Sequence, residues 1–137
     1  HQIVSELEIS IGALFDNEVE DDGIVMRAGT RHVIQTSAIR PGEGVGIECC
    51  IQNPTARLLY GAIHIVAPGG GSAGGISHEG EEIGYVLEGK LDLEVDGQLY
   101  KLEPGESFFF RSDLEHGYKN VTDKTTRIFW VNTPPTF

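Results

Sequence analysis

Two histidines and one glutamate in the second half of the chain carry side chains that could together hold a metal ion. His78 and Glu82 stand four residues apart after the glycine-rich run 69–75, and His116 follows beyond the turn at Pro104-Gly105. Imidazole and carboxylate groups suit zinc, nickel, manganese or ferrous iron, and three ligands leave positions open for water or substrate. Residues of these types are also commonly solvated or hydrogen-bonded within a fold, so their chemistry alone leaves both interpretations open.

Short strands joined by tight turns are expected to position these side chains. Leu91, Leu93 and Val95 alternate with acidic residues, which predicts a strand with one buried and one solvated face. Asp96-Gly97 predicts a two-residue type I′ hairpin turn after it. The continuous apolar run 108–110 suits a strand covered on both faces. The expected strands lie near 24–27, 31–37, 45–51, 57–67, 83–88, 91–96, 98–102, 106–111, 116–121 and 126–132.

This strand pattern predicts an all-β sandwich or barrel, whereas the start of the chain has a different pattern. Between residues 1 and 15, apolar residues recur at spacings of three and four, as they do along one face of a helix. Residues 16–22 are mostly acidic and are interpreted as a linker. We therefore expect a short helical remnant with its linker over 1–22 and a β domain over 23–137.

The overall charge and the cysteine usage restrict the possible partners and location. A net charge of −11 argues against nucleic-acid binding by this chain, because phosphate binding needs clustered Lys and Arg. The two cysteines, Cys49 and Cys50, are adjacent and are expected to be buried, inert thiols, with a redox switch as the alternative. No apolar run has the length of a membrane span and no signal peptide is visible, so a cytoplasmic location is expected.

The segment 70–120 resembles the two sequence motifs of the cupin superfamily. The matching residues are Gly70, His78, Glu82 and Gly89 in the first motif, and Gly105, His116 and Asn120 in the second. Arg111 and Asp113 replace the usual Pro and Gly of a turn and do not affect a ligand position. The resemblance implies a double-stranded β-helix, which is a small jelly-roll barrel, over about 115 residues.

One departure from the cupin pattern falls at a ligand position. Ile76 stands where the first metal-binding His is usual, and an aliphatic side chain cannot ligate. The resemblance then implies either a divalent metal (Zn, Ni, Mn or Fe) held by His78, Glu82 and His116 alone, or a pocket that binds its ligand without metal. The departure disfavours oxygenase-type chemistry.

Further stretches are similar to effector domains of the cupin-bearing XRE family of helix-turn-helix transcriptional regulators. These stretches are 74–89 and the ending 131–137, while residues 3–15 resemble the end of the DNA-binding domain of such a regulator. The resemblance implies a sensor domain that binds a small-molecule effector and acts on DNA through a helix-turn-helix domain absent from this chain. Such regulators usually read palindromic operators and cupins commonly pair edge to edge, so a homodimer is expected.

The residues expected to bind the effector surround the acidic turn before the strand 83–88. Strand alternation should turn either Glu81 or Glu82 inward, where a carboxylate would bind an ammonium group. The resemblance and the acidic charge favour a polyamine or an amino acid as the effector. The expected ligand-binding set is His78, Glu81, Glu82, Tyr85, Phe108 and His116, with ordinary core packing as the alternative for the aromatic residues.

Two other functions compete with the sensor. One is a small metal-dependent enzyme, an isomerase or dioxygenase, that uses the metal as a Lewis acid; the other is a scaffold barrel without a ligand. Ile76 disfavours the enzyme, and the helical pattern before the acidic linker favours the sensor, so no catalytic residue is assigned. His32 and His64 lie on other strands without a partner pattern and are interpreted as structural or exposed.

Overall fold

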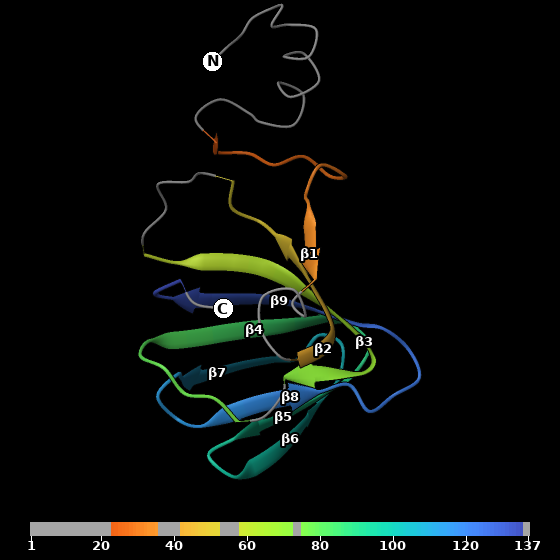
Figure 1. Ribbon diagram of the computed structural model, residues 1–137, viewed down its shortest axis with the longest axis vertical. Coiled ribbons are helices and arrows are strands. Elements are labelled where there is room, and N and C mark those ends of the chain that lie inside the picture. Colours follow the sequence, from red (N-terminus) through yellow and green to blue (C-terminus); the bar gives the residue numbers. More distant parts are fainter. Residues whose placement is uncertain (1–22, 36–41, 53–57, 73–74, 136–137) are drawn as a thin grey trace, which may run out of the picture.

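A computed structural model describes residues 23–35, 42–52, 58–72 and 75–135, which form a β-sheet rolled into a small barrel (Figure 1). The strands are β1 (Val33–Gln35), β2 (Gly42–Cys49), β3 (Tyr60–Ser72), β4 (Glu81–Glu88), β5 (Leu91–Val95), β6 (Gln98–Leu102), β7 (Ser107–Arg111), β8 (His116–Lys119) and β9 (Thr126–Thr133). Within these ranges no α-helix occurs, which confirms the all-β prediction. None of the described helical structure is long and apolar enough to cross a membrane.

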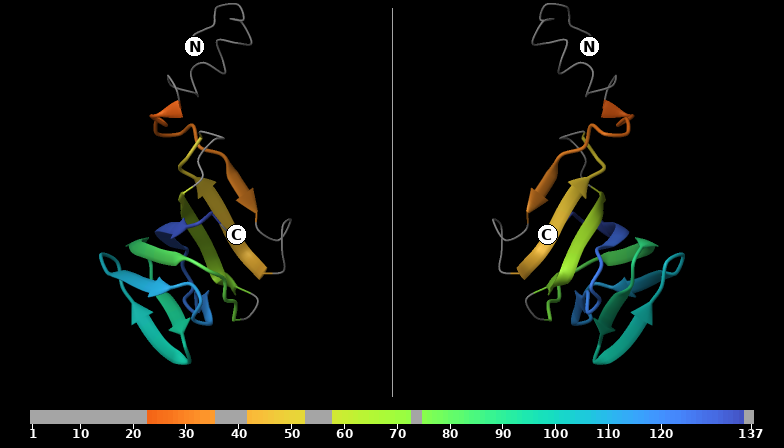
Figure 2. Two further views of the ribbon diagram at one scale, coloured as in Figure 1. Left: turned by 90° about the vertical axis from the view of Figure 1, so that its left-hand side faces the viewer. Right: turned by 90° about the vertical axis from the view of Figure 1, so that its right-hand side faces the viewer.

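The long strand β3 connects the two ends of the barrel. The strands follow the order β6-β5-β8-β3-β9-β4-β7, and β2 joins β3 while β1 joins β2. The pairs along this path are antiparallel; β3 pairs with β9 along its first part, with β2 along its first part and again at its end, and with β8 at Gly71. Figure 2 shows β1 and β2 at one end of the molecule and the β5–β6 hairpin at the other.

The core lies inside the barrel because the strands alternate between buried and exposed side chains. Along β4, Glu82, Gly84 and Val86 are buried, and the alternating residues Ile83 and Tyr85 are exposed. Along β5 the three apolar residues are buried, as the alternating pattern predicted. The buried apolar core consists of Val45, Ile47, Ala62, Val66, Val86, Leu91, Leu93, Val95, Phe110, Tyr118, Ile128 and Trp130.

Two glycine-containing features fix the geometry near the core. At the predicted β5–β6 turn, Asp96 and Gly97 have φ values of 52° and 81°, which are the positive values that a type I′ turn requires. On β4, Gly84 lies opposite both Phe108 and Trp130 in the sheet. A side chain at Gly84 would collide with the Phe108 ring, so this glycine makes room for an aromatic residue at the barrel wall.

Several expectations differ from the structure. Residues 24–27 form no strand, and β3 extends to Ser72 through the first glycines instead of ending near residue 67. The prediction that 108–110 is covered on both faces is wrong for Phe109, which is 61% exposed, because alternation along β7 turns it to the outer face of the barrel while Phe110 is buried. The helical remnant and linker expected over 1–22 lie outside the described residues.

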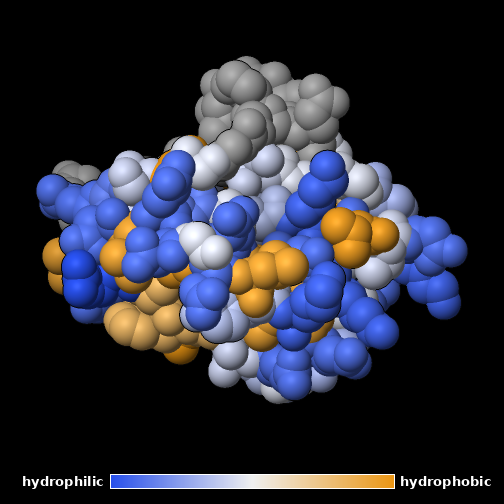
Figure 3. Space-filling view, turned by 90° about the horizontal axis from the view of Figure 1, so that it is seen from below, coloured by the Kyte–Doolittle hydropathy of each residue, from blue (hydrophilic) through white to orange (hydrophobic). Residues whose placement is uncertain are grey.

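Exposed apolar side chains are found on the outside of the barrel. Seen from below, apolar groups lie among hydrophilic ones across the visible face (Figure 3). The register places some of them together on three neighbouring strands, since Ile83 is opposite Phe109, and Tyr85 is opposite Phe129. We refer to Ile83, Tyr85, Leu87, Phe109 and Phe129 as the outer apolar face; their exposed fractions lie between 39% and 61%.

Candidate metal and ligand site

Backbone pairing brings His78, Glu82 and His116 together at one end of the barrel. Glu82 points inward from β4, and His116 begins β8. The segment that carries His78 is held against β8, because Ile76 and His116 exchange two backbone hydrogen bonds of 2.8 Å. The His78 N–H also donates to the Ser112 carbonyl at 3.0 Å, which fixes the imidazole-bearing segment beside the barrel mouth.

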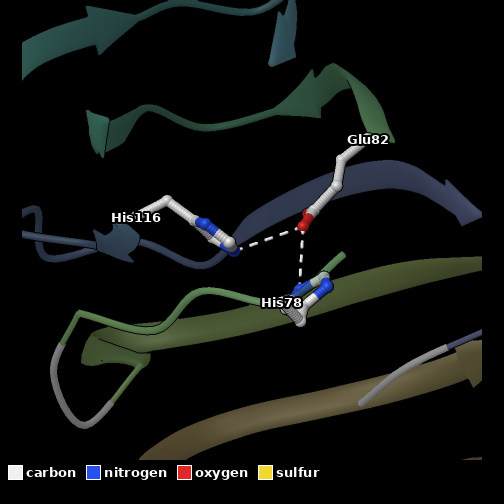
Figure 4. Close-up of side chains that lie close together, drawn as sticks. All are labelled: His78, Glu82 and His116. Atoms are coloured by element: carbon white, nitrogen blue, oxygen red, sulfur yellow. Dashed lines mark ion pairs between the residues drawn. The ribbon is translucent and has the colours of Figure 1, made fainter. Parts of the chain in front are cut away.

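The three side chains converge on one carboxylate oxygen. Glu82 Oε2 lies 3.1 Å from His78 Nε2 and 3.2 Å from His116 Nε2 (Figure 4). Glu82 and His116 are each 5% exposed, whereas the His78 side chain is 24% exposed. Despite these short distances, Oε2 is buried without a well-directed hydrogen bond from any described residue. A buried carboxylate oxygen in this state can accept a metal ion or a hydrogen bond from water.

Hydrogen bonds to the far side of each imidazole orient it toward the carboxylate. His116 Nδ1 lies 2.7 Å from the Leu114 carbonyl, and His78 Nδ1 lies 3.1 Å from the Glu79 carbonyl. A carbonyl only accepts, so Nδ1 carries the hydrogen in both rings, and in neutral imidazole Nε2 then has its lone pair free. Ring nitrogens held in this way are typical of metal-binding histidines.

The spacing of the ligand atoms also fits a metal. Ligand atoms about 2.1 Å from a tetrahedral zinc lie about 3.4 Å from one another. The two observed oxygen–nitrogen distances, 3.1 and 3.2 Å, are close to that value, and all three ligand atoms lie within 4.8 Å of one another. The set therefore fits a divalent ion that takes nitrogen and oxygen ligands and keeps further positions for other molecules.

The buried pair Glu82 and His116 favours its charged form. Burial acts to raise the pKa of Glu82, but interactions with His116, the Trp130 N–H and the Ser112 hydroxyl outweigh burial and lower it. Burial acts to lower the pKa of His116, but Glu82 and the Leu114 carbonyl outweigh burial and raise it. The site without metal thus tends to hold a carboxylate beside an imidazolium.

A cluster of rings forms the wall behind Glu82. The Trp130 N–H donates to Glu82 Oε1 at 2.8 Å. The Trp130 ring stacks on His64 with centroids 4.7 Å apart, and its edges meet Phe108 at 4.9 Å and Tyr118 at 5.0 Å. The second oxygen of Glu82, Oε1, therefore accepts a hydrogen bond from an indole that neighbouring rings hold in place.

The converging side chains open into a small cavity. Its volume is about 50 Å³, and one water needs about 10–15 Å³. The cavity would therefore hold a metal ion with a few waters, or the head of a larger molecule. The cavity is lined by Ile47, Tyr60, His64, Ser72, Ile76, His78, Glu82, Leu93, His116, Gly117, Tyr118, Trp130 and Asn132.

The structure brings together some of the residues expected to bind ligand and separates others. His78, Glu82 and His116 line the cavity, and of the two glutamates it is Glu82 that points inward. Glu81 is exposed, and Tyr85 lies on the outer apolar face, so neither lines this cavity. Phe108 does not line the cavity and packs against the Trp130 ring, which does.

Four rings that line the cavity were not in the expected ligand-binding set. Tyr60, Tyr118 and Trp130 face the cavity, and so does His64, which was interpreted as structural or exposed. Alternation along β3 was the available signal, because Ala62 and Val66, on either side of His64, are fully buried. The other histidine without a partner pattern, His32, is exposed as expected.

Cys49 and Cys50 are free thiols that are half-buried, not buried as expected. Cys49 Sγ lies 3.0 Å from the Tyr60 hydroxyl. Burial is the main cause that raises the pKa of Cys50, which keeps it in the unreactive thiol form at neutral pH. For Cys50 this agrees with the expectation of an inert thiol.

Comparisons with known proteins place the chain in one family. Residues 62–132, which include all three ligand candidates, match the family described as Cupin domain. The chain belongs to the cupin family. This cupin is also 34% identical over 95 residues to the HTH-type transcriptional regulator PuuR of Escherichia coli strain K12, a match that covers 69% of this chain and 51% of the regulator. It thus spans about half the length of the curated relative that it matches.

Solved structures show the same fold in proteins of different kinds. The Cupin_2 domain of an XRE family transcriptional regulator from Enterobacter cloacae superposes with a TM-score of 0.60 at 22% identity, covering 69% of this chain and all of that one. The polyketide cyclase RemF from Streptomyces resistomycificus superposes with a TM-score of 0.70 at 22% identity, covering 82% and 81% of the two chains. These likenesses support the fold and do not distinguish a sensor from an enzyme.

Proposed function

We propose that this cupin is the effector-binding domain of a DNA-binding transcriptional regulator. The observation that carries the proposal is the 34% identity to a helix-turn-helix regulator across 69% of this chain. A helix-turn-helix domain elsewhere in the protein would contact DNA in the cytoplasm. Effector binding in the barrel would alter its DNA affinity by favouring one of two conformations, and so control repression.

The cavity supports a divalent metal as part of the effector site. His78, Glu82 and His116 would hold the ion through two nitrogens and one oxygen, which suits zinc, nickel, manganese or iron. Ile76 lines the same cavity but supplies no ligand, so the ion would keep positions open for other molecules. A bound metal there would supply a positive anchor for an anionic or lone-pair-bearing group of the effector.

The effector class proposed for the pocket is a small amine-bearing metabolite, either a polyamine or an amino acid. Glu82 gives the pocket a buried carboxylate, and the net charge of −11 favours the approach of a cation. With metal bound, an amino acid could ligate through its own amine and carboxylate. With no metal, Glu82 would face the ammonium group directly. A cavity of about 50 Å³ holds only the head of such a molecule, so its remainder would extend toward the half-exposed Ile76 at the rim.

A homodimer is proposed for the complete regulator, and the outer apolar face supports it. Five apolar side chains that share neighbouring strands are between 39% and 61% exposed, and such a patch is typical of protein interfaces. A two-fold axis through this face would bring the same patch of two copies together, which matches the symmetry of a palindromic operator.

A metal-dependent enzyme is the second candidate, and the three-ligand arrangement is what favours it. A site with three protein ligands and open positions is the arrangement of many catalytic metals. The metal would act as a Lewis acid on a substrate in the cavity. The relationship to a regulator favours the sensor over this alternative.

Thermal melts of the chelator-treated protein test the proposal. Zn²⁺, Ni²⁺, Mn²⁺ and Fe²⁺ would each be added alone, followed by polyamines and amino acids with and without metal. A ligand of the folded state stabilises it by about 2.7 kcal/mol at a free concentration of 100 times its dissociation constant. We expect a saturable rise in the midpoint with one metabolite class.

The matched variants for this test are His116→Ala, which removes a cavity ligand, and His32→Ala, which removes an exposed imidazole elsewhere. The metal-dependent rise should disappear in the first variant and persist in the second. The enzyme would be the better assignment than the sensor if no metabolite raised the midpoint and the metal-loaded protein turned over an added substrate.

A further inference from the structure

The two oxygens of the Glu82 carboxylate have different surroundings. Oε2 faces both imidazoles at 3.1 and 3.2 Å, whereas Oε1 accepts the Trp130 N–H at 2.8 Å. We infer that Trp130 is a positioning residue that occupies Oε1, so that Glu82 binds the metal through Oε2 alone. This inference rests on the proposed metal site and adds the way in which its carboxylate binds.

The sheet register explains why this contact is built into the fold. Trp130 lies opposite Gly84 on the adjacent strand, and Glu82 is two residues before Gly84 on the same inward face of β4. Diagonal neighbours of this kind are within reach of a long aromatic side chain. Gly84 also leaves the space in which Phe108 meets the indole edge.

The indole itself has little freedom to turn away. Trp130 is 5% exposed; His64 stacks on its ring, while Phe108 and Tyr118 meet it edge to face. An indole nitrogen can only donate, so it presents one N–H in one direction. Packing therefore fixes the direction of the donor, and the donor fixes the rotation of the carboxylate.

The arrangement determines how many positions the metal keeps open. A carboxylate that turned to bind through both oxygens would fill a position that a monodentate carboxylate leaves free. That free position is the one available to water or to the effector. Trp130 would therefore affect effector binding without touching the metal.

The composition of the chain allows a test that changes one atom group. The protein contains a single tryptophan, so growth on benzothienylalanine in a tryptophan auxotroph replaces only the Trp130 N–H by a sulfur that cannot donate. The ring shape and its packing contacts stay. Affinity for Zn²⁺ alone would be measured by competition with a chelator, and Zn²⁺-induced difference infrared spectra would report how the carboxylate binds.

We expect the substituted protein to bind Zn²⁺ about tenfold more weakly, the lower end of the effect of losing such a supporting hydrogen bond. We also expect the separation of its carboxylate stretching bands to change from a monodentate to a bidentate pattern, which a purely structural role would not cause. A Trp130→Phe variant, which also lacks the donor, should show the same pattern.

The possible failures can be distinguished. Native protein that binds Zn²⁺ with the same affinity and the same bands as the substituted protein would overturn this inference and leave the metal site intact. Native protein that shows no Zn²⁺ binding, or binding that survives His116→Ala, would overturn the proposed metal site and this inference with it.

Discussion

The second-motif residue Asn120 is expected to stabilise the fold and to play no part in metal binding. Its side chain is fully buried and lies in the turn between β8 and β9. The amide nitrogen donates to the Val66 carbonyl at 3.0 Å and to the Lys124 carbonyl at 2.6 Å. The amide oxygen accepts from the Thr122 N–H at 2.9 Å and from its hydroxyl at 2.7 Å. One side chain thus connects β3 to both ends of the turn.

Replacing Asn120 by alanine removes four hydrogen bonds at once. Each is worth about 1 kcal/mol net, and buried partners left unpaired cost more, so we expect a loss of about 3–4 kcal/mol in the free energy of unfolding. For a domain of this size that corresponds to a fall of roughly 10–15 °C in the melting midpoint. Asn120→Asp should be destabilising as well, because a carboxylate cannot donate to two carbonyls.

Urea unfolding followed by the fluorescence of the single tryptophan measures this effect. Lys124→Ala is the matched control, since the carbonyl that Asn120 uses remains while the exposed side chain is lost, and it should change stability by less than about 0.5 kcal/mol. A loss below about 1 kcal/mol for Asn120→Ala would refute this reasoning. Weaker Zn²⁺ binding by a stably folded variant would show that Asn120 belongs to the site after all.

Three further outcomes follow from the structure. In the presence of chelator, the stability that the Glu82–His116 pair contributes should be fully present between pH 4.5 and 6.5, the usual pKa values of the two groups. This stability should be lost as the pH falls through the lowered pKa of Glu82, and also as the pH rises through the raised pKa of His116. Urea titrations of native and His116→Ala protein at several pH values check this. Gly84→Ala should destabilise the protein by about 1–3 kcal/mol in the same assay, because the new methyl group meets the Phe108 ring; an unchanged midpoint would contradict the close packing. Phe109→Ser should weaken self-association in sedimentation experiments without lowering the melting midpoint of the monomer, whereas unchanged association would exclude the outer apolar face as the dimer contact.

Local strand and turn patterns allowed an all-β sandwich or barrel to be predicted, whereas the cupin fold and the three converging residues were predicted from the resemblance to the cupin motifs. Alternation along residues 91–95 and the Asp96-Gly97 pair specify a hairpin with little help from the rest of the chain. The spacing of His78, Glu82 and His116 was informative only together with its resemblance to the cupin motifs. Alternation also required one of Glu81 and Glu82 to face inward, and the structure shows that it is Glu82.

The residues that form the cavity wall could not be predicted from local patterns, because they are far apart in the chain. Trp130 meets a glutamate 48 residues away, and Tyr118 meets His64 at a separation of 54 residues. A lone His64 on an apolar strand carries no signal of such partners. Tyr85 was assigned to the pocket although it shares the outward phase of β4, and Phe109 was expected to be covered because a run of three apolar residues hides the alternation of an edge strand.

The length of β3 has a mechanical consequence. One continuous strand of 13 residues forms part of the cavity wall through His64 and also pairs with β2, which carries Glu48 on its outer side. Glu48 holds Arg31 by a 2.8 Å ion pair in the segment that leads from the start of the chain into β1. A displacement of β3 at the cavity would also act on the backbone hydrogen bonds that join it to β2. Glu48 therefore joins the segment before β1 to β2, the strand that pairs with the cavity-lining β3.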